Sequence, residues 1–158
     1  MDGEQVRNLG HVRIINAANG GRLSVSSGNT SGESEHATVQ RQEERWSTDH
    51  WRLRLEKDGL YSIWNLGSSP NERSLHVDQI KEKERDTVRV RAKVTAQLWE
   101  LRALSDGRVM FLPQNDSFRK ALGLENPGDA NWTWAVLLGG RAPSADRTWY
   151  IEDVSGGV

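Results

Sequence analysis

Three tryptophans stand at nearly equal intervals along the chain, and each opens the same short pattern. Trp51, Trp99 and Trp149 are 48 and 50 residues apart in the 158-residue sequence. Apolar residues alternate after each of them, as Leu53 and Leu55 do after the first. Alternation of period two is typical of a β-strand with one buried face. A repeat of this length indicates that one supersecondary unit is built three times.

The segments before each tryptophan also keep the same order. Each repeat opens with an alternating run, continues with a short apolar pair and adds a third strand. The leucines of the apolar pairs are Leu23, Leu75 and Leu122. We align the third strands on Val39, Val88 and Trp134, which predicts that the Trp134 side chain packs in the interior. Four short strands in each repeat give twelve strands, and the sequence contains no convincing amphipathic helix.

Two Asp-Gly pairs, Asp58-Gly59 and Asp106-Gly107, separate the last strand of one repeat from the first strand of the next. Asp-Gly between alternating strands favours a type I′ hairpin turn, which needs positive φ at both central residues. The repeats are therefore predicted at about residues 11–57, 58–106 and 107–154, within a single domain that spans residues 1–158.

Twelve antiparallel strands in three equivalent units can close into a barrel, which removes exposed sheet edges. The arrangement that fits is an all-β β-trefoil with three pseudo-symmetric four-strand repeats, in which six strands form the barrel and three hairpins cap it. We expect the repeated tryptophans to lie in the shared core, one from each repeat.

Composition narrows the function. The chain has 21 Lys and Arg against 22 Asp and Glu, a formal charge of -1, so we expect neither a nucleic-acid nor an anionic-membrane partner. No apolar run approaches the roughly 18 residues of a membrane span. There is no cysteine, which excludes disulfide scaffolds, thiol catalysis and Cys-zinc sites. Without a signal-peptide pattern at the N-terminus, we expect a cytoplasmic protein.

Catalytic motifs are also missing from the sequence. The four histidines have no metal-ligand spacing, and no nucleophile elbow or phosphate-binding loop is present. We therefore expect no enzymatic activity, no catalytic residue, no metal and no cofactor.

The second repeat carries a family resemblance. It contains LYSIWN, SLHV, TVRVR and AQLWEL, and Gln97-Leu98-Trp99 forms a Q-x-W triplet. This resembles one lobe of the ricin B-chain-like (R-type) β-trefoil lectins, whose lobes run Y-x-I-x-N, L-D-V, V-Q-L-W and N-Q-x-W. The resemblance covers about residues 11–154. Among such proteins, the lack of cysteine is similar to the fungal trefoil lectins and the mycocypin-like protease inhibitors.

The resemblance implies one sugar site in each lobe, built from an aspartate that accepts hydrogen bonds from sugar hydroxyls, a stacking aromatic residue and an asparagine. The aspartate position holds Ser24, His76 and Gly123, the aromatic position Gln42, Arg91 and Leu137, and the asparagine position Thr48, Ala96 and Asp146. No lobe keeps a complete site. The resemblance therefore implies a lectin-like carbohydrate-binding module with degenerate sites, and a glycan as its partner.

Tryptophan side chains elsewhere in the chain are candidates to replace the missing stacking residues. The chain has seven Trp against two Phe and two Tyr, and an exposed indole can stack on the apolar face of a sugar or anchor an interface. Trp132 stands beside Asp129 and Asn131, which add a carboxylate and an amide. Trp46 with Asp49 is the second candidate cluster. We predict that these five residues contact the glycan.

A rival hypothesis concerns the charged stretch at residues 79–86, which contains Lys81, Lys83 and Arg85. Such a loop could present a basic side chain to a trypsin-like specificity pocket, and the protein would then be a protease inhibitor that acts through β-trefoil loops. A trefoil with only a structural or protein-binding role is a third possibility. The sequence leaves the sugar, the target protease and the oligomeric state open.

Overall fold

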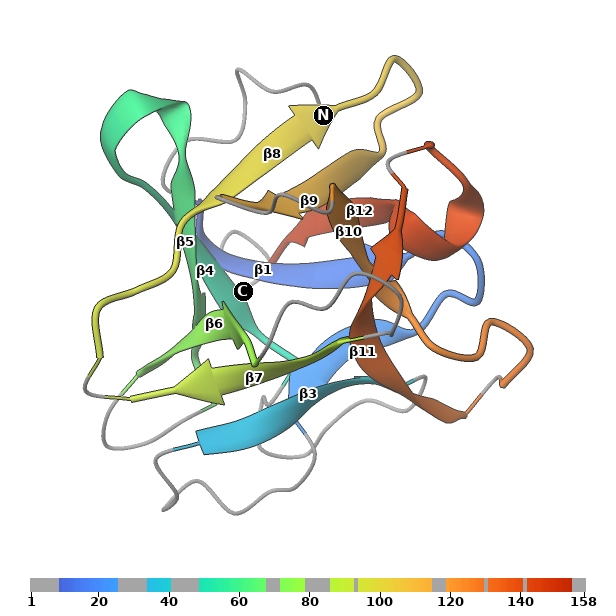
Figure 1. The fold of residues 1–158 in the computed structure, drawn as a ribbon, viewed down its shortest axis with the longest axis horizontal. Helices are drawn as coiled ribbons and strands as arrows, with labels where there is room; N and C mark the ends of the chain where they lie inside the picture. The colour runs from blue at the N-terminus through green and yellow to red at the C-terminus, as the bar shows by residue number, and fades with distance from the viewer. Residues whose placement is uncertain are drawn as a thin grey trace.

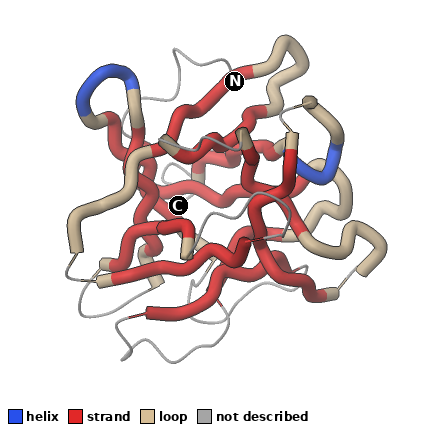
Figure 2. Tube along the Cα trace, viewed as in Figure 1, coloured by secondary structure: helices blue, strands red, loops and turns tan. Residues whose placement is uncertain are grey.

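β-Strands make up nearly all the regular structure (Figure 2). The computed structural model describes residues 9–25, 34–40, 49–67, 72–78, 86–92, 94–114, 119–129, 131–140 and 142–154. The strands are β1 (Leu9–Asn16), β2 (Arg22–Val25), β3 (Ser34–Gln40), β4 (Trp51–Leu55), β5 (Tyr61–Asn65), β6 (Arg73–Val77), β7 (Asp86–Arg91), β8 (Trp99–Ala103), β9 (Val109–Pro113), β10 (Lys120–Leu124), β11 (Trp132–Gly139) and β12 (Trp149–Asp153). Two short 3-10 turns, η1 (Lys57–Gly59) and η2 (Ala145–Arg147), accompany them.

Six of these strands form a closed barrel. β1 pairs with β4, β4 with β5, β5 with β8, β8 with β9, β9 with β12, and β12 again with β1. The other six form three hairpins, β2–β3, β6–β7 and β10–β11. Their second strands, β3, β7 and β11, pair with one another and form a cap (Figure 1). This is the β-trefoil that the repeats predict, and the prediction is confirmed.

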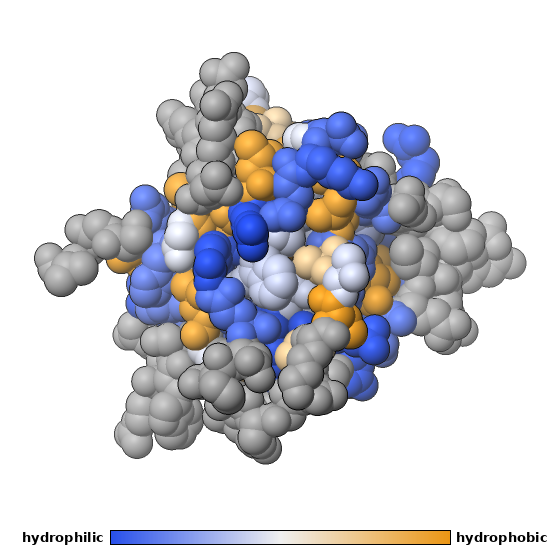
Figure 3. All heavy atoms as spheres, turned by 90° about the vertical axis from the view of Figure 1, so that its left-hand side faces the viewer, coloured by the Kyte–Doolittle hydropathy of each residue, from blue (hydrophilic) through white to orange (hydrophobic). Residues whose placement is uncertain are grey.

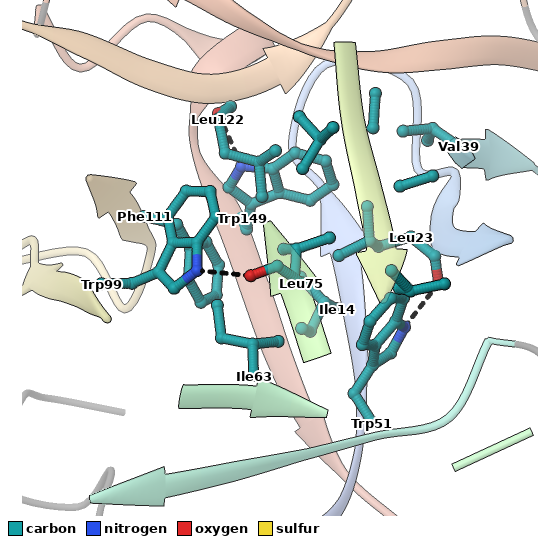
Figure 4. Packing of buried hydrophobic residues seen from close by; sticks show 14 of the residues in the cluster. Ile14, Leu23, Val39, Trp51, Ile63, Leu75, Trp99, Phe111, Leu122 and Trp149 are labelled. Atoms are coloured by element: carbon teal, nitrogen blue, oxygen red, sulfur yellow. Dashed lines mark hydrogen bonds between the residues drawn. The ribbon is translucent and has the colours of Figure 1, made fainter. Parts of the chain in front are cut away.

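The three repeated tryptophans lie in the core, also as predicted. Each is the first residue of its barrel strand and is fully buried. Each indole Nε1 donates a hydrogen bond to the carbonyl of the equivalent leucine in the hairpin of its own repeat (Figure 4). The pairs are Trp51–Leu23 at 2.8 Å, Trp99–Leu75 at 3.1 Å and Trp149–Leu122 at 3.0 Å. These bonds join each part of the barrel to the cap.

The register of the third strands differs from our alignment. The core leucines pair with Val39, Val90 and Leu137, so the alignment on Val88 and Trp134 was wrong. Ala135 and Leu137 fill the core, and the period of two then turns Trp134 to the outer face of the cap. The hydrophobicity of Trp134 alone predicts the inner, core-facing side of the cap.

The two Asp-Gly seams adopt different turns. Asp58 and Gly59 have φ of 58° and 73°, as a type I′ turn requires, so this prediction is confirmed. At the second seam only Gly107 has positive φ, at 90°. Its N–H donates to the Leu104 carbonyl at 3.2 Å, so the turn begins one residue earlier in a loop of equal length. The Asp106 carboxylate accepts the Arg108 backbone N–H at 3.2 Å.

Replacement of Trp99 by Phe removes an indole donor and leaves a small void. The Leu75 carbonyl then has one donor fewer in the interior, and we expect a loss of about 2–4 kcal/mol in the free energy of unfolding. Urea titration measures this loss. Trp64→Phe is the matched control, because Trp64 is half-buried on β5 and donates to the Ser62 hydroxyl at 2.8 Å. Equal losses in the two variants would contradict the role of the buried bond.

Candidate functional site

A continuous row of aromatic and basic side chains crosses the outer face of the cap. We call it the cap strip: Trp132 and Trp134 from β11, His36 from β3 and Arg89 from β7. The two indoles meet edge to face with ring centroids 4.6 Å apart and planes at 73°. Trp134 packs on His36 at 5.1 Å, and His36 Nε2 lies 2.8 Å from Arg89 Nη2. Strand register explains the row, because His36 pairs with Arg89 and Trp134 pairs with Thr38, two residues further along β3.

The loop before β11 places a carboxylate at the exposed end of this strip. Asp129 Oδ1 accepts the backbone N–H groups of Asn131 at 3.0 Å and Trp132 at 3.1 Å. These two hydrogen bonds lower the pKa of Asp129, because they stabilise its charged form. Asn131 is exposed, and Trp132 exposes 38% of its surface. The structure thus brings together the three residues of our first predicted cluster, and their contact with a sugar stays a prediction.

Sequence reasoning missed one residue that holds this loop. The Asn19 amide donates through Nδ2 to the Asp129 carbonyl at 3.2 Å and accepts the Gly21 N–H at 2.8 Å. It therefore ties a turn of the first repeat to the loop of the third. The Asn19-Gly20 pair signals a turn, and Gly20 has φ of 72°, but nothing local in the sequence names the distant partner.

The carboxylate of the second predicted cluster, that of Asp49, is buried. Asp49 is 1% exposed, and its carboxylate lies 3.0 Å from Arg22 Nη1 and 3.6 Å from Arg13 Nε. His50, which contacts His11 at 2.5 Å, also lies beside it. A carboxylate buried against these cations is not available to a sugar, so we drop Asp49 from the candidate site. Trp46 lies outside the described residues.

The three positions at which the lectin resemblance implies an aspartate hold buried or closely packed residues. A Cβ atom on Gly123 would lie 2.5 Å from Leu138 Cδ1 and 2.8 Å from the Asp146 carbonyl. Ser24 is fully buried, and His76 is nearly buried with Nε2 at 2.8 Å from the Ser74 hydroxyl. A carboxylate side chain at position 123 would therefore clash with these atoms, and the side chains at positions 24 and 76 are buried. Gln42 and Thr48, from the other two positions, lie outside the described part of the chain.

Residues 79–85 of the charged stretch 79–86 in the protease-inhibitor hypothesis also lie outside the described residues. Asp86, the last residue of the stretch, is buried on β7 with its carboxylate 3.4 Å from Lys120 Nζ. Within the described ranges, no group of three or more His, Asp or Glu side chains could hold a metal ion. No helix in these ranges is long and apolar enough to cross a membrane.

A separate hollow of about 350 Å³ lies at the seam of the first two repeats and is lined by Glu56, Lys57, Thr95, Ala96 and Leu98. It contains no aromatic side chain that could stack on a sugar. On the molecular face shown in Figure 3, apolar residues lie scattered between hydrophilic ones. The cap strip is therefore the candidate site.

Comparison with known proteins supports the fold. No family model matches the sequence, and no curated protein matches it. Among solved structures, the designed three-fold symmetric protein ThreeFoil is similar with a TM-score of 0.77 and 20% identity over 91% of this chain and 99% of that one.

Natural proteins are similar at the same level. The ricin B-like lectin of Macrolepiota procera, solved in complex with lactose, has a TM-score of 0.70 and 14% identity over 94% of this chain and 98% of that one. A mosquitocidal holotoxin is similar with a TM-score of 0.74 and 18% identity. The match covers 94% of this chain but only 17% of the toxin chain. At these identities the likeness establishes a ricin B-like β-trefoil fold.

Substitution of Gly123 by Ala tests the close packing at the third aspartate position. The added methyl group must displace Leu138 or the Asp146 backbone, and we expect a loss of about 1–3 kcal/mol in unfolding free energy. Gly139→Ala on the paired strand serves as control, because a Cβ atom there would meet no other atom within 4 Å, and should stay within about 0.5 kcal/mol of the parent. A neutral Gly123→Ala variant would show that this position has space.

Two histidines on the cap make its stability depend on pH. Burial lowers the pKa of His36 below its ordinary 6.5, and Arg89 adds to this while Asp78 opposes it. Burial also lowers the pKa of His76, with a further contribution from Arg91. The unfolded chain therefore binds more protons, so this stability is complete above pH 6.5 and is lost as pH falls through the folded-state pKa values.

We expect the urea midpoint to fall in mildly acidic buffer, and to fall less when His36 and His76 are both replaced by Gln. Each variant is compared with itself at neutral pH, so that a uniform loss of stability does not enter the result. An unchanged pH dependence in the double variant would assign the effect to other groups.

Proposed function

We propose that the protein is a non-catalytic carbohydrate-binding module that binds glycan at the Trp132 end of the cap strip. The observation that carries this proposal is the environment of Trp132. Its indole is exposed, rests against Trp134, and adjoins the ionised carboxylate of Asp129 and the exposed Asn131 amide. A pyranose needs this combination, because it has one apolar CH face and a rim of hydroxyl groups.

A protein of similar fold supports a sugar site, and the packing of this chain bears on where that site lies. A solved trefoil of the same fold is a ricin B-like lectin in complex with lactose. In the present chain, however, the positions that correspond to the lectin aspartates are filled by packing. Trp132 lies at another place on the same outer face of the cap, where its side chain is exposed. The proposed module thus binds sugar at a non-standard place on a familiar scaffold.

Rigidity also favours Trp132 as the stacking residue. Its backbone N–H is held by Asp129, its indole contacts that of Trp134, and β11 pairs with β3 at this point. A stacking side chain that is already held in place loses little conformational entropy when a ligand binds. Stacking of a base on an aromatic residue contributes about 1–3 kcal/mol, and a sugar stack should be of similar or smaller size.

The experiment is a glycan-array screen followed by calorimetry with the best ligand. We expect Trp132→Ala to weaken binding at least about tenfold, equivalent to about 1.4 kcal/mol, with an unchanged unfolding midpoint. Tyr150→Ala is the matched control, because Tyr150 is 45% exposed on the barrel strand β12, and its removal should leave affinity unchanged.

The same preparation is assayed against papain-, trypsin- and pepsin-type proteases. Binding on the array without inhibition supports the module. Inhibition without glycan binding would favour the inhibitor and overturn the proposal, as would a folded Trp132→Ala variant with the parent affinity.

A further inference from the structure

Among the described residues, two acidic ones, Asp129 and Glu125, lie beside the two indoles of the cap strip. Asp129 lies at one side of Trp132, with one carboxylate oxygen on two backbone N–H groups. Its other oxygen accepts no hydrogen bond from any residue that the structure describes. The free oxygen of an ionised carboxylate is a strong acceptor for a cationic donor.

Glu125 lies beside Trp134 on the same face of the cap. Its backbone N–H donates to the Trp134 carbonyl at 2.9 Å, one step beyond the pair Leu124–Ala135 on β10 and β11. Leu124 and Ala135 face the core, and successive residues of a strand face opposite sides, so Glu125 faces outward as Trp134 does. The indole pair therefore has an acidic residue on each side.

The cation of the strip, Arg89, is balanced by a neighbouring carboxylate. Arg89 Nε lies 3.2 Å from Asp78 Oδ2, and its Nη2 contacts His36. Arg22, on the strand next to β3, lies 3.0 Å from the buried Asp49. Among the described side chains, these basic groups are paired with acids of their own, which leaves the local field at Asp129 negative.

The indoles themselves favour a cation. Their planes stand at 73° to each other with centroids 4.6 Å apart, so the edge of one ring points at the face of the other, and Trp132 keeps 38% of its surface exposed. The face of an indole carries negative potential and attracts an ammonium group, more strongly where water is excluded. A ligand that fits has a CH face for Trp132 and a positive charge for the indole pair and Asp129.

On the basis of the proposed function, we infer that the glycan bound at Trp132 is an amino sugar with a free ammonium group, of the glucosamine type found in deacetylated chitin. The ammonium group donates to the free oxygen of Asp129, and the pyranose ring stacks on the Trp132 indole. An N-acetylated sugar offers the same ring without the charge.

The test compares glucosamine oligomers with fully N-acetylated oligomers of equal length, by calorimetry in mildly acidic buffer in which the amine is protonated. We expect the glucosamine oligomer to bind at least tenfold more tightly, and this preference to shrink as salt is added. Equal or tighter binding of the acetylated oligomer would overturn the inference. If that binding is lost in Trp132→Ala, the proposed function stands without the amino-sugar assignment.

Asp129→Asn is the decisive variant, because its amide oxygen can still accept the two backbone N–H groups. We expect it to remove the preference, with about a tenfold loss for the glucosamine oligomer and at most a twofold change for the acetylated one. Asp106→Asn, at another turn where a carboxylate accepts a backbone N–H, is the matched control and should change neither. An unchanged preference in a folded Asp129→Asn variant would overturn the inference, and no binding of any glycan would overturn the proposed function with it.

Discussion

The hydrogen bond from each buried indole to a leucine carbonyl is the contact on which the rest of the structure depends. It joins a barrel strand to the hairpin of the same repeat, and it occurs three times with nearly equal length. A carbonyl at such a junction would otherwise be buried without a donor, which is costly. Tryptophan meets both needs, because it fills the interior and carries one N–H. The spacing of these residues sets the size of each repeat.

The sequence was sufficient to predict the features that recur in the core of all three repeats. It was not sufficient for features that depend on the pairing of residues far apart in the chain. Alternation and the three tryptophans predicted the barrel and the cap, because the same burial recurs three times. The orientation of Trp134 was missed, since it follows from the register of β11 against β10 and β3. Asp49 beside Trp46 looked like a polar loop residue, and only the folded chain brings Arg13 and Arg22 to it. The Asp129 cluster was predictable because its contacts are local.

The cap has a symmetric inner face and an asymmetric outer one. Trp134, His36 and Thr87 take part in the three pairings between hairpins, yet their chemistry has nothing in common. On the inner face, the equivalent positions are all aliphatic, as in Val39, Val90 and Leu137. Packing fixes the inner residues, while the outer residues are restricted only by strand pairing. A single binding site on a threefold scaffold is therefore expected on the outer face.

Closure of the barrel by β1 and β12 has a consequence for how the chain acquires its structure. These strands pair along five positions, and Arg13 lies against Glu152, 139 residues away in the sequence. Contacts of such separation form late, because a long loop must be ordered first. During synthesis on the ribosome, the first two repeats emerge before β12 has been made. The edge of β1 that pairs with β12 therefore stays unpaired during that time. An exposed strand edge can pair with strands of other chains. The nascent chain is therefore prone to aggregation until β12 is synthesised and pairs with β1.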